Sequence, residues 1–154
     1  MTLHKAVATV FGLGYAPKAP GTFGTLGAFL FCLFANYLFP VNYISIVFLI
    51  GAFAGIFGIY STNKVIPIWG DDPSRVVVDE FVGYIITLTF IPFTLTNLLL
   101  AFILFRFFDI LKPLGVKAID EKIKGGLGVM LDDVLAGIYA CLSLHLILFL
   151  QSLI

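Results

Sequence analysis

The chain has 154 residues, of which 60% are hydrophobic and only 12% are charged, and its mean hydropathy is +1.09. Soluble domains carry about 25% charged residues, so this composition excludes an ordinary soluble fold and predicts one membrane-embedded domain over residues 1–154. The formal net charge is zero, and no Lys/Arg-rich face lacks matching carboxylates, which argues against a nucleic-acid partner.

The first long apolar stretch runs from Ala19 to Asn63 without a charge, and the turn-like sequence Phe39-Pro40-Val41-Asn42 divides it. Each half approaches the roughly 20 residues that a membrane-spanning helix needs. We therefore predict a helical hairpin, with helices at about Phe23–Phe39 and Tyr43–Tyr60. A third span is predicted at Val134–Ile154, where His145 is interpreted as a polar contact between helices.

The stretch Phe81–Phe105 fits either one tilted span or a hairpin, because a turn-like sequence begins at Ile91-Pro92. The positions of the charges favour the hairpin. All nine basic and nine acidic residues lie in the segments 5–18, 64–80 and 106–133, and a hairpin places all three segments on one side of the membrane. That side would be cytoplasmic by the positive-inside rule, so we expect an all-α, polytopic bundle of helical hairpins with a cytoplasmic-face active site.

Acidic residues on this polar face occur in groups, several of them beside membrane helices, where an uncompensated carboxylate is costly. Two or three converging carboxylates are enough to hold a hard cation such as Mg²⁺. The candidates are Asp79, Glu80, Asp109, Asp132 and Asp133. Surface ion pairs with nearby Arg and Lys residues are the alternative. Asp120-Glu121, flanked by lysines, is interpreted as a solvated loop, and Asp71-Asp72-Pro73 as a turn that leads to Ser74 as a helix N-cap.

Two glycine-rich stretches offer backbone amides to an anion. In Gly12–Thr25, prolines and glycines argue against a regular helix and leave Lys18 and two threonine hydroxyls at the mouth of the first span. Gly125–Gly128 is predicted to precede the last helix, close to Asp132 and Asp133. A phosphate there could meet amide donors and a metal together.

The sequence Arg106-Phe-Phe-Asp-Ile-Leu-Lys-Pro113 places two cations and Asp109 three residues apart. All three side chains would share one helical face before Pro113 disrupts the helix. The arrangement suits a substrate phosphate bridged to a metal. The alternative is an interfacial pair that snorkels to lipid head groups.

Four motifs resemble the phosphatidylglycerophosphatase A family, and they occur in the family's order between about Gly12 and Ala140. They are GYAPKAPGTFGT from Gly14, VDEFVGY from Val78, FRFFDILKP from Phe105 and KGGLGVMLDDVLAG from Lys124. The resemblance implies a Mg²⁺-dependent, multi-pass enzyme of the bacterial inner membrane that hydrolyses the phospholipid phosphatidylglycerophosphate to phosphatidylglycerol and phosphate.

By position, the resemblance implies catalytic and metal-binding roles for the five acids. On the phosphate side it implies Lys18, Thr22, Arg106 and Lys112. We expect direct attack by a water that the metal activates, with one carboxylate as general base, and an aspartyl-phosphate intermediate stays open. A small cation transporter or channel subunit and an alcohol phosphotransferase-type lipid enzyme are the rival functions.

Overall fold

A computed structural model describes residues 2–71, 73–113, 115–116 and 122–153, and all regular secondary structure within them is helical, with no β-strand. The predicted all-α class is therefore confirmed. In chain order the elements are α1 (Leu3–Ala8), the 3-10 helix η1 (Leu13–Tyr15), α2 (Pro20–Leu38), α3 (Tyr43–Trp69), α4 (Val78–Thr87), α5 (Leu95–Leu111) and α7 (Gly125–Gln151).

Three helices, α2, α3 and α7, are long and apolar enough to cross a membrane. At 1.5 Å per residue, the 19 residues of α2 extend about 29 Å and the 27 residues of α3 and α7 about 40 Å, against a hydrocarbon core of about 30 Å. Most of their side chains point outward, as expected of helices that face lipid, so the predicted membrane bundle is confirmed.

The helix boundaries correct the sequence-based prediction in three places. Helix α3 continues to Trp69 instead of ending near Tyr60. Helix α2 begins at Pro20, so the second half of the glycine-rich stretch is helical, because proline suits the first turn of a helix. Helix α7 begins at Gly125 rather than Val134, so the glycines form its first turn instead of preceding it. A Cβ at Gly126 would collide with the Ile59 carbonyl of α3. Close packing, rather than a loop, explains this glycine.

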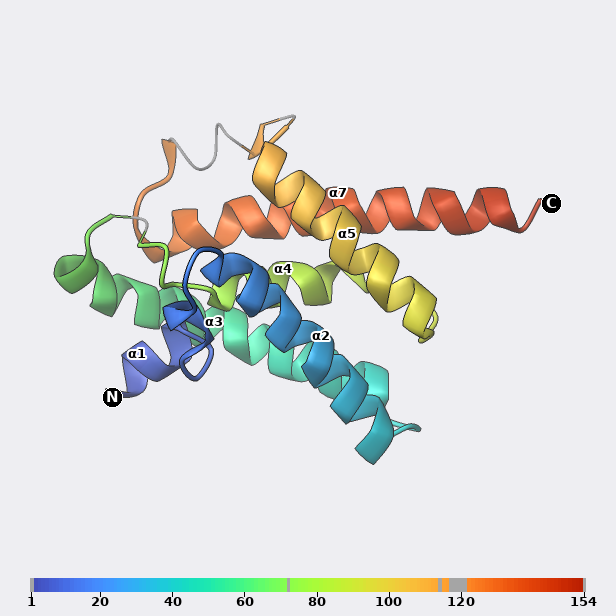
Figure 1. The fold of residues 1–154 in the computed structure, drawn as a ribbon, viewed down its shortest axis with the longest axis horizontal. Helices are drawn as coiled ribbons and strands as arrows, with labels where there is room; N and C mark the ends of the chain where they lie inside the picture. Colours follow the sequence, from blue (N-terminus) through green and yellow to red (C-terminus); the bar gives the residue numbers. More distant parts are fainter. Residues whose placement is uncertain (1, 72, 114, 117–121, 154) are drawn as a thin grey trace.

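The region Phe81–Phe105 forms a hairpin, as the charge pattern indicated. Helix α4 has ten residues and extends about 15 Å, too short to cross a bilayer. The chain then turns at 88–94 and returns as α5. Figure 1 shows this turn, the turn between α2 and α3, and the C-terminus at one end of the molecule, with the charged segments at the other.

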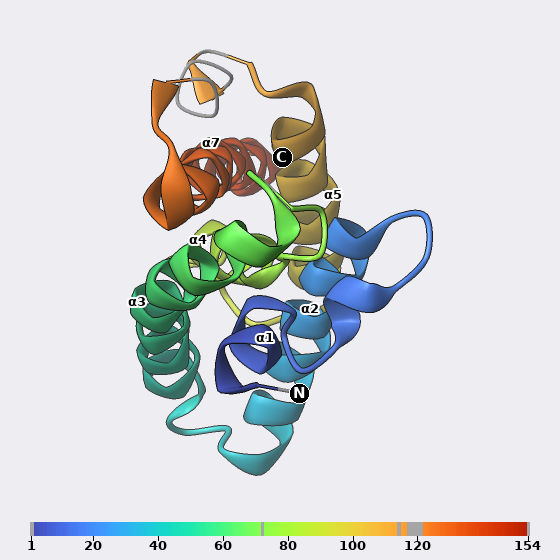
Figure 2. The ribbon, with the colours of Figure 1, turned by 90° about the vertical axis from the view of Figure 1, so that its left-hand side faces the viewer.

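Helix α4 lies at the centre of the bundle, packed against α2, α3, α5 and α7 (Figure 2). Its backbone approaches α7 most closely at Gly83 and Gly137, where a Cβ on Gly137 would collide with the Gly83 carbonyl. Asp79 and Asp133 each lie four residues, about one turn, before these glycines. The glycine contact therefore sets the register that brings the two acids together.

The predicted N-cap at Ser74 is wrong. Helix α4 starts at Val78 with Val77 as its N-cap residue, and Ser74 lies in a turn that the Val76 amide closes by donating to the Pro73 carbonyl at 2.8 Å. His145 also differs from the prediction. Its Nδ1 lies 2.9 Å from the carbonyl oxygen of Cys141 in its own helix rather than contacting another helix through its ring.

Candidate functional site

Three predicted acids form one cluster at the charged end of the bundle. Asp79, Glu80 and Asp133 each place one carboxylate oxygen within 4.8 Å of the others. The Asp79 and Asp133 side chains are buried, with 7% and 4% of their surface exposed. The cluster joins the first turn of α4 to the third turn of α7, two segments that lie more than 50 residues apart in sequence.

The electrostatics of the cluster are unfavourable without a cation. Burial raises the pKa of Asp79 well above its ordinary value, and the carboxylates of Glu80 and Asp133 raise it further. Burial also raises the pKa of Glu80. The N-terminus of α4 offsets part of this cost, because the helix dipole favours acids in the first turn and the Glu80 amide donates to Asp79 Oδ1 at 3.0 Å.

Two carboxylate oxygens in the cluster lack any hydrogen-bond partner among the described residues. They are Glu80 Oε2 and Asp133 Oδ2, both buried. Buried polar atoms are normally paired, so two orphaned carboxylate oxygens in one cluster call for a ligand. Hard divalent cations take oxygen ligands of this kind. The donor set therefore fits a hard divalent cation, and Asp79, Glu80 and Asp133 are the residues that could hold one.

Helix α5 is the third helix that borders the cluster, after α4 and α7. Asp109 interacts electrostatically with Glu80 and Asp133, and its Oδ2 lies 2.5 Å from Arg106 Nη1. Arg106 Nε is buried without a hydrogen-bond partner among the described residues. An unsatisfied guanidinium donor beside a carboxylate cluster suits an anionic substrate group held between cation and acids.

Lys112 differs from the prediction that it shares a helical face with Arg106 and Asp109. Helix α5 ends at Leu111, and Lys112 has a left-handed backbone with φ of 45°. Its Nζ forms an ion pair with Asp132 Oδ2 of α7 at 2.7 Å. Asp132 is thus the neighbour of Asp133 in the chain, but its charge is compensated by Lys112.

The N-terminus of α2 closes the site on a fourth side. A Cβ at Gly21 would collide with Glu80 Oε1 and lie 3.2 Å from Arg106 Nη1, so glycine here leaves room for the Glu80 carboxylate and the Arg106 guanidinium beside α2. Thr22 follows Gly21 and is partly exposed. Lys18 is exposed and lines a separate depression with Tyr15, Ser74 and Arg75, which none of the five acids lines.

Sequence reasoning missed the residue that supports the start of α7. Helix α7 lacks a side-chain cap from its own N-cap residue, and Asn63 of α3 supplies one, accepting the Gly126 N–H on Oδ1 at 2.8 Å. This contact joins residues 63 positions apart, so no local pattern signals it. Gly21, by contrast, belongs to the motif from Gly14, and its glycine requirement could have been read as close approach.

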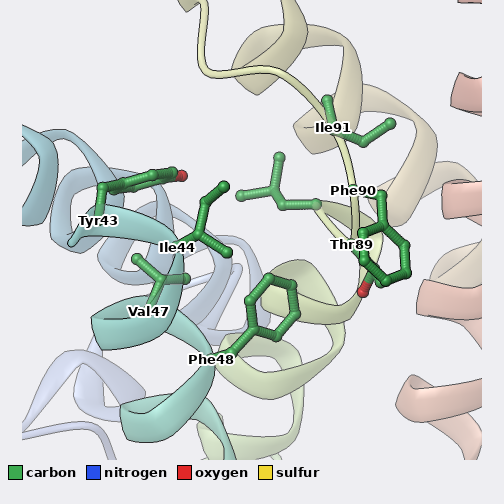
Figure 3. A pocket seen from close by; sticks show the side chains of 8 residues that line it. Tyr43, Ile44, Val47, Phe48, Thr89, Phe90 and Ile91 are labelled. Atoms are coloured by element: carbon green, nitrogen blue, oxygen red, sulfur yellow. The ribbon is translucent and has the colours of Figure 1, made fainter. Parts of the chain in front are cut away.

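The cavity in Figure 3 lies at the other end of α4 and has a volume of about 300 Å³. It is lined by Tyr43, Ile44, Val47, Phe48 and Leu88–Ile91. The lining is almost wholly apolar and contains no carboxylate, amine or imidazole, so this cavity lacks the charged groups that the acid cluster supplies.

Fold and site together define a membrane-embedded helical protein with a buried carboxylate centre at its charged end. The chain matches the family described as Phosphatidylglycerophosphatase A over residues 6–148. It belongs to that family, and it is a phosphatase acting in phospholipid biosynthesis.

Curated relatives agree on a lipid phosphatase. Phosphatidylglycerophosphatase A of Haemophilus influenzae is 42% identical, covering 87% of this chain and 82% of the relative. The Escherichia coli protein of the same name is 34% identical, covering 92% and 81%. A Bacteroides thetaiotaomicron protein with the provisional name phosphatidylinositol-3-phosphatase is 45% identical, covering 87% and 86%. No solved structure matches this chain.

The family membership decides between the functions that the residues left open. An enzyme that removes phosphate from a lipid is supported, whereas the cation transporter and the alcohol phosphotransferase are not.

Proposed function

We propose that this phosphatase hydrolyses phosphatidylglycerophosphate to phosphatidylglycerol and inorganic phosphate, with Mg²⁺ as its metal. The observation that carries the proposal is the set of buried carboxylates with two orphaned oxygens beside the unsatisfied Arg106 donor. Two relatives named phosphatidylglycerophosphatase A support the substrate. We further propose that the charged end faces the cytoplasm of a bacterial inner membrane, because the sequence confines all Lys and Arg residues to the segments 5–18, 64–80 and 106–133.

The geometry of the cluster supports a role for each residue. Asp79, Glu80 and Asp133 would hold the metal, and Arg106 would donate to the phosphate oxygens from the α5 side. Bound Mg²⁺ would offset the negative charge of the phosphate and lower the pKa of water. Asp109 orients Arg106 through their ion pair, and Lys112 does the same for Asp132.

The reaction breaks the phosphorus–oxygen bond to the terminal glycerol. The oxygen of a water molecule attacks phosphorus while one carboxylate of the cluster accepts its proton as general base. The departing glycerol oxygen takes up a proton and leaves as the free hydroxyl of phosphatidylglycerol. Arg106 stabilises the charge that accumulates on the phosphate oxygens during transfer.

The test is phosphate release by the purified protein from phosphatidylglycerophosphate in mixed micelles. We expect release with Mg²⁺ and its loss in excess chelator, with recovery when Mg²⁺ is added back. Phosphatidylinositol-3-phosphate serves as the second substrate, because one relative bears that name. Faster phosphate release from phosphatidylinositol-3-phosphate would contradict the proposed substrate. Phosphate release that persists in excess chelator would contradict the proposed requirement for Mg²⁺.

A further inference from the structure

A second basic site lies beside the acid cluster. An open depression of about 410 Å³ is lined by Tyr15, Lys18, Pro20, Ser74 and Arg75, among others. It combines two cationic side chains with two hydroxyl groups, and none of the lining residues is acidic. The reaction proposed above uses none of these side chains.

The position of Arg75 is fixed by its surroundings. Its guanidinium carbon lies 5.8 Å from the centre of the Tyr15 ring and 6.0 Å from that of Trp69, at cation–π distances. The loop that carries Arg75 is fastened to the N-terminal segment. Val77 N–H donates to the Ala8 carbonyl at 2.9 Å, and a Cβ at Gly14 would collide with the Arg75 carbonyl. Contacts with Ala8 and Gly14 of the N-terminal segment thus hold the loop that carries Arg75 in place.

Its charge is not balanced within the described part of the chain. Neither Lys18 nor Arg75 forms an ion pair with a described carboxylate, although Asp71 lines an adjacent depression together with Arg75. Arg106 and Lys112, by contrast, are both paired with acids. Two cations without such a partner, beside the aromatic rings of Tyr15 and Trp69 that suit a membrane interface, favour an anion at head-group level.

The depression adjoins the acid cluster through consecutive residues. Pro20 lines the depression, and Gly21 contacts Glu80 and Arg106. An anion beside Lys18 and the phosphate beside Arg106 would therefore be separated by the short backbone segment Pro20-Gly21. A head group that carries two phosphates could reach both.

Phosphatidylglycerophosphate carries two such phosphates. One is a diester that joins the diacylglycerol to the head-group glycerol, and the other is the terminal monoester that is cleaved. We propose that Lys18 and Arg75 bind the diester phosphate while the acid cluster and Arg106 receive the monoester. The inference rests on the proposed function and makes the enzyme select lipids in which a diester and a monoester share one polyol.

The test separates the two phosphates by kinetics in micelles of a neutral detergent. With phosphatidylglycerophosphate, we expect Arg75→Met and Lys18→Met each to raise KM about tenfold, the cost of one charge-assisted contact, with kcat within twofold of wild type. Arg75→Lys retains the charge and should recover most of the loss. Lys64→Met is the matched control, because Lys64 is an exposed cation over the Tyr60 ring outside the depression.

Product inhibition shows which of the two substrate phosphates, the diester or the monoester, Arg75 binds. Phosphatidylglycerol retains only the diester, and inorganic phosphate resembles only the monoester. In Arg75→Met we expect inhibition by phosphatidylglycerol to weaken about tenfold, with inhibition by inorganic phosphate unchanged. Equal weakening of both inhibitors, an unchanged KM, no inhibition of wild type by phosphatidylglycerol, or the same loss in Lys64→Met would each overturn the inference. An inactive wild-type enzyme would instead overturn the proposed function on which it rests.

Discussion

The two ends of helix α4 bury polar groups in opposite ways. At the C-terminal end, the Thr87 hydroxyl donates to the Gly83 carbonyl at 3.0 Å, and the Tyr84 hydroxyl donates to the Leu98 carbonyl at 3.0 Å. At the N-terminal end, Glu80 Oε2 has no partner among the described residues. A satisfied buried hydroxyl contributes stability, whereas an orphaned buried carboxylate costs stability and is explained by a ligand.

The largest expected effect is at the N-terminal end. Asp79→Asn and Asp133→Asn should each lower kcat/KM about a thousandfold or more, because a metal and its charge stabilisation are worth several kcal/mol and each 1.36 kcal/mol is tenfold. Phosphate release from micelles measures this, with gel filtration in detergent as the folding control. Asp120→Asn, in a segment outside the described residues, should cost less than about twofold. Wild-type activity in either cluster variant would remove that residue from the site.

Metal binding should also raise the free energy of unfolding, which can be measured without any assay of activity. Mg²⁺ at about 100 times its Kd should stabilise the folded enzyme by about 2.7 kcal/mol, seen as a rise in Tm. In Glu80→Gln the rise should shrink, because one ligand oxygen no longer carries charge. An equal rise in both proteins would place the bound metal elsewhere.

The register between the helices can be broken without touching an acid. Gly137→Ala should destabilise the protein by about 1–3 kcal/mol through overpacking and lower kcat, since the added Cβ meets the Gly83 carbonyl and displaces Asp133 from Asp79. Gly55→Ala is the matched control, because its Cβ would meet only Val82 Cγ1, at 3.9 Å. Thermal unfolding and kcat of the two variants are compared. Equal behaviour would mean that the Gly83–Gly137 contact does not set the site.

The smallest effect belongs to the C-terminal end. Tyr84→Phe removes one buried hydrogen bond and should lower stability by about 1 kcal/mol while leaving kcat unchanged. Tyr37→Phe, at a tyrosine that is 81% exposed, should change neither quantity. A large loss of activity in Tyr84→Phe would show that the two ends of α4 are coupled.

The sequence predicted the fold class, the outward-facing spans and the hairpin at Phe81–Phe105, because bilayer thickness and the position of charges restrict these strongly. It predicted the helix starts at Pro20 and Gly125 poorly. Glycine and proline have low helix propensity, and local rules could not foresee that Gly126 would sit against the Ile59 carbonyl. Tertiary packing outweighed propensity at the start of α7, whereas the start of α2 follows a local rule, the preference of proline for the first turn of a helix.

The predicted acids were brought together only in part. Asp79, Glu80 and Asp133 form the cluster, with Asp109 close to it, whereas Asp132 pairs with Lys112. Adjacency in the chain did not decide which acids meet, because the neighbours Asp79 and Glu80 both reach the cluster, whereas Asp132 is held by Lys112 beside its neighbour Asp133. Their individual roles in catalysis stay predictions.

The sequence by itself determined that this protein is a membrane helical bundle with its carboxylates at one end, since hydropathy and charge act along the chain without reference to contacts. Only the tertiary structure decided which oxygens meet and which remain unpaired. That depends on how closely α2, α4 and α7 approach at Gly21, Gly83 and Gly137, and on the Asn63 cap from a distant helix. Distances between segments are set by packing, which no local pattern encodes.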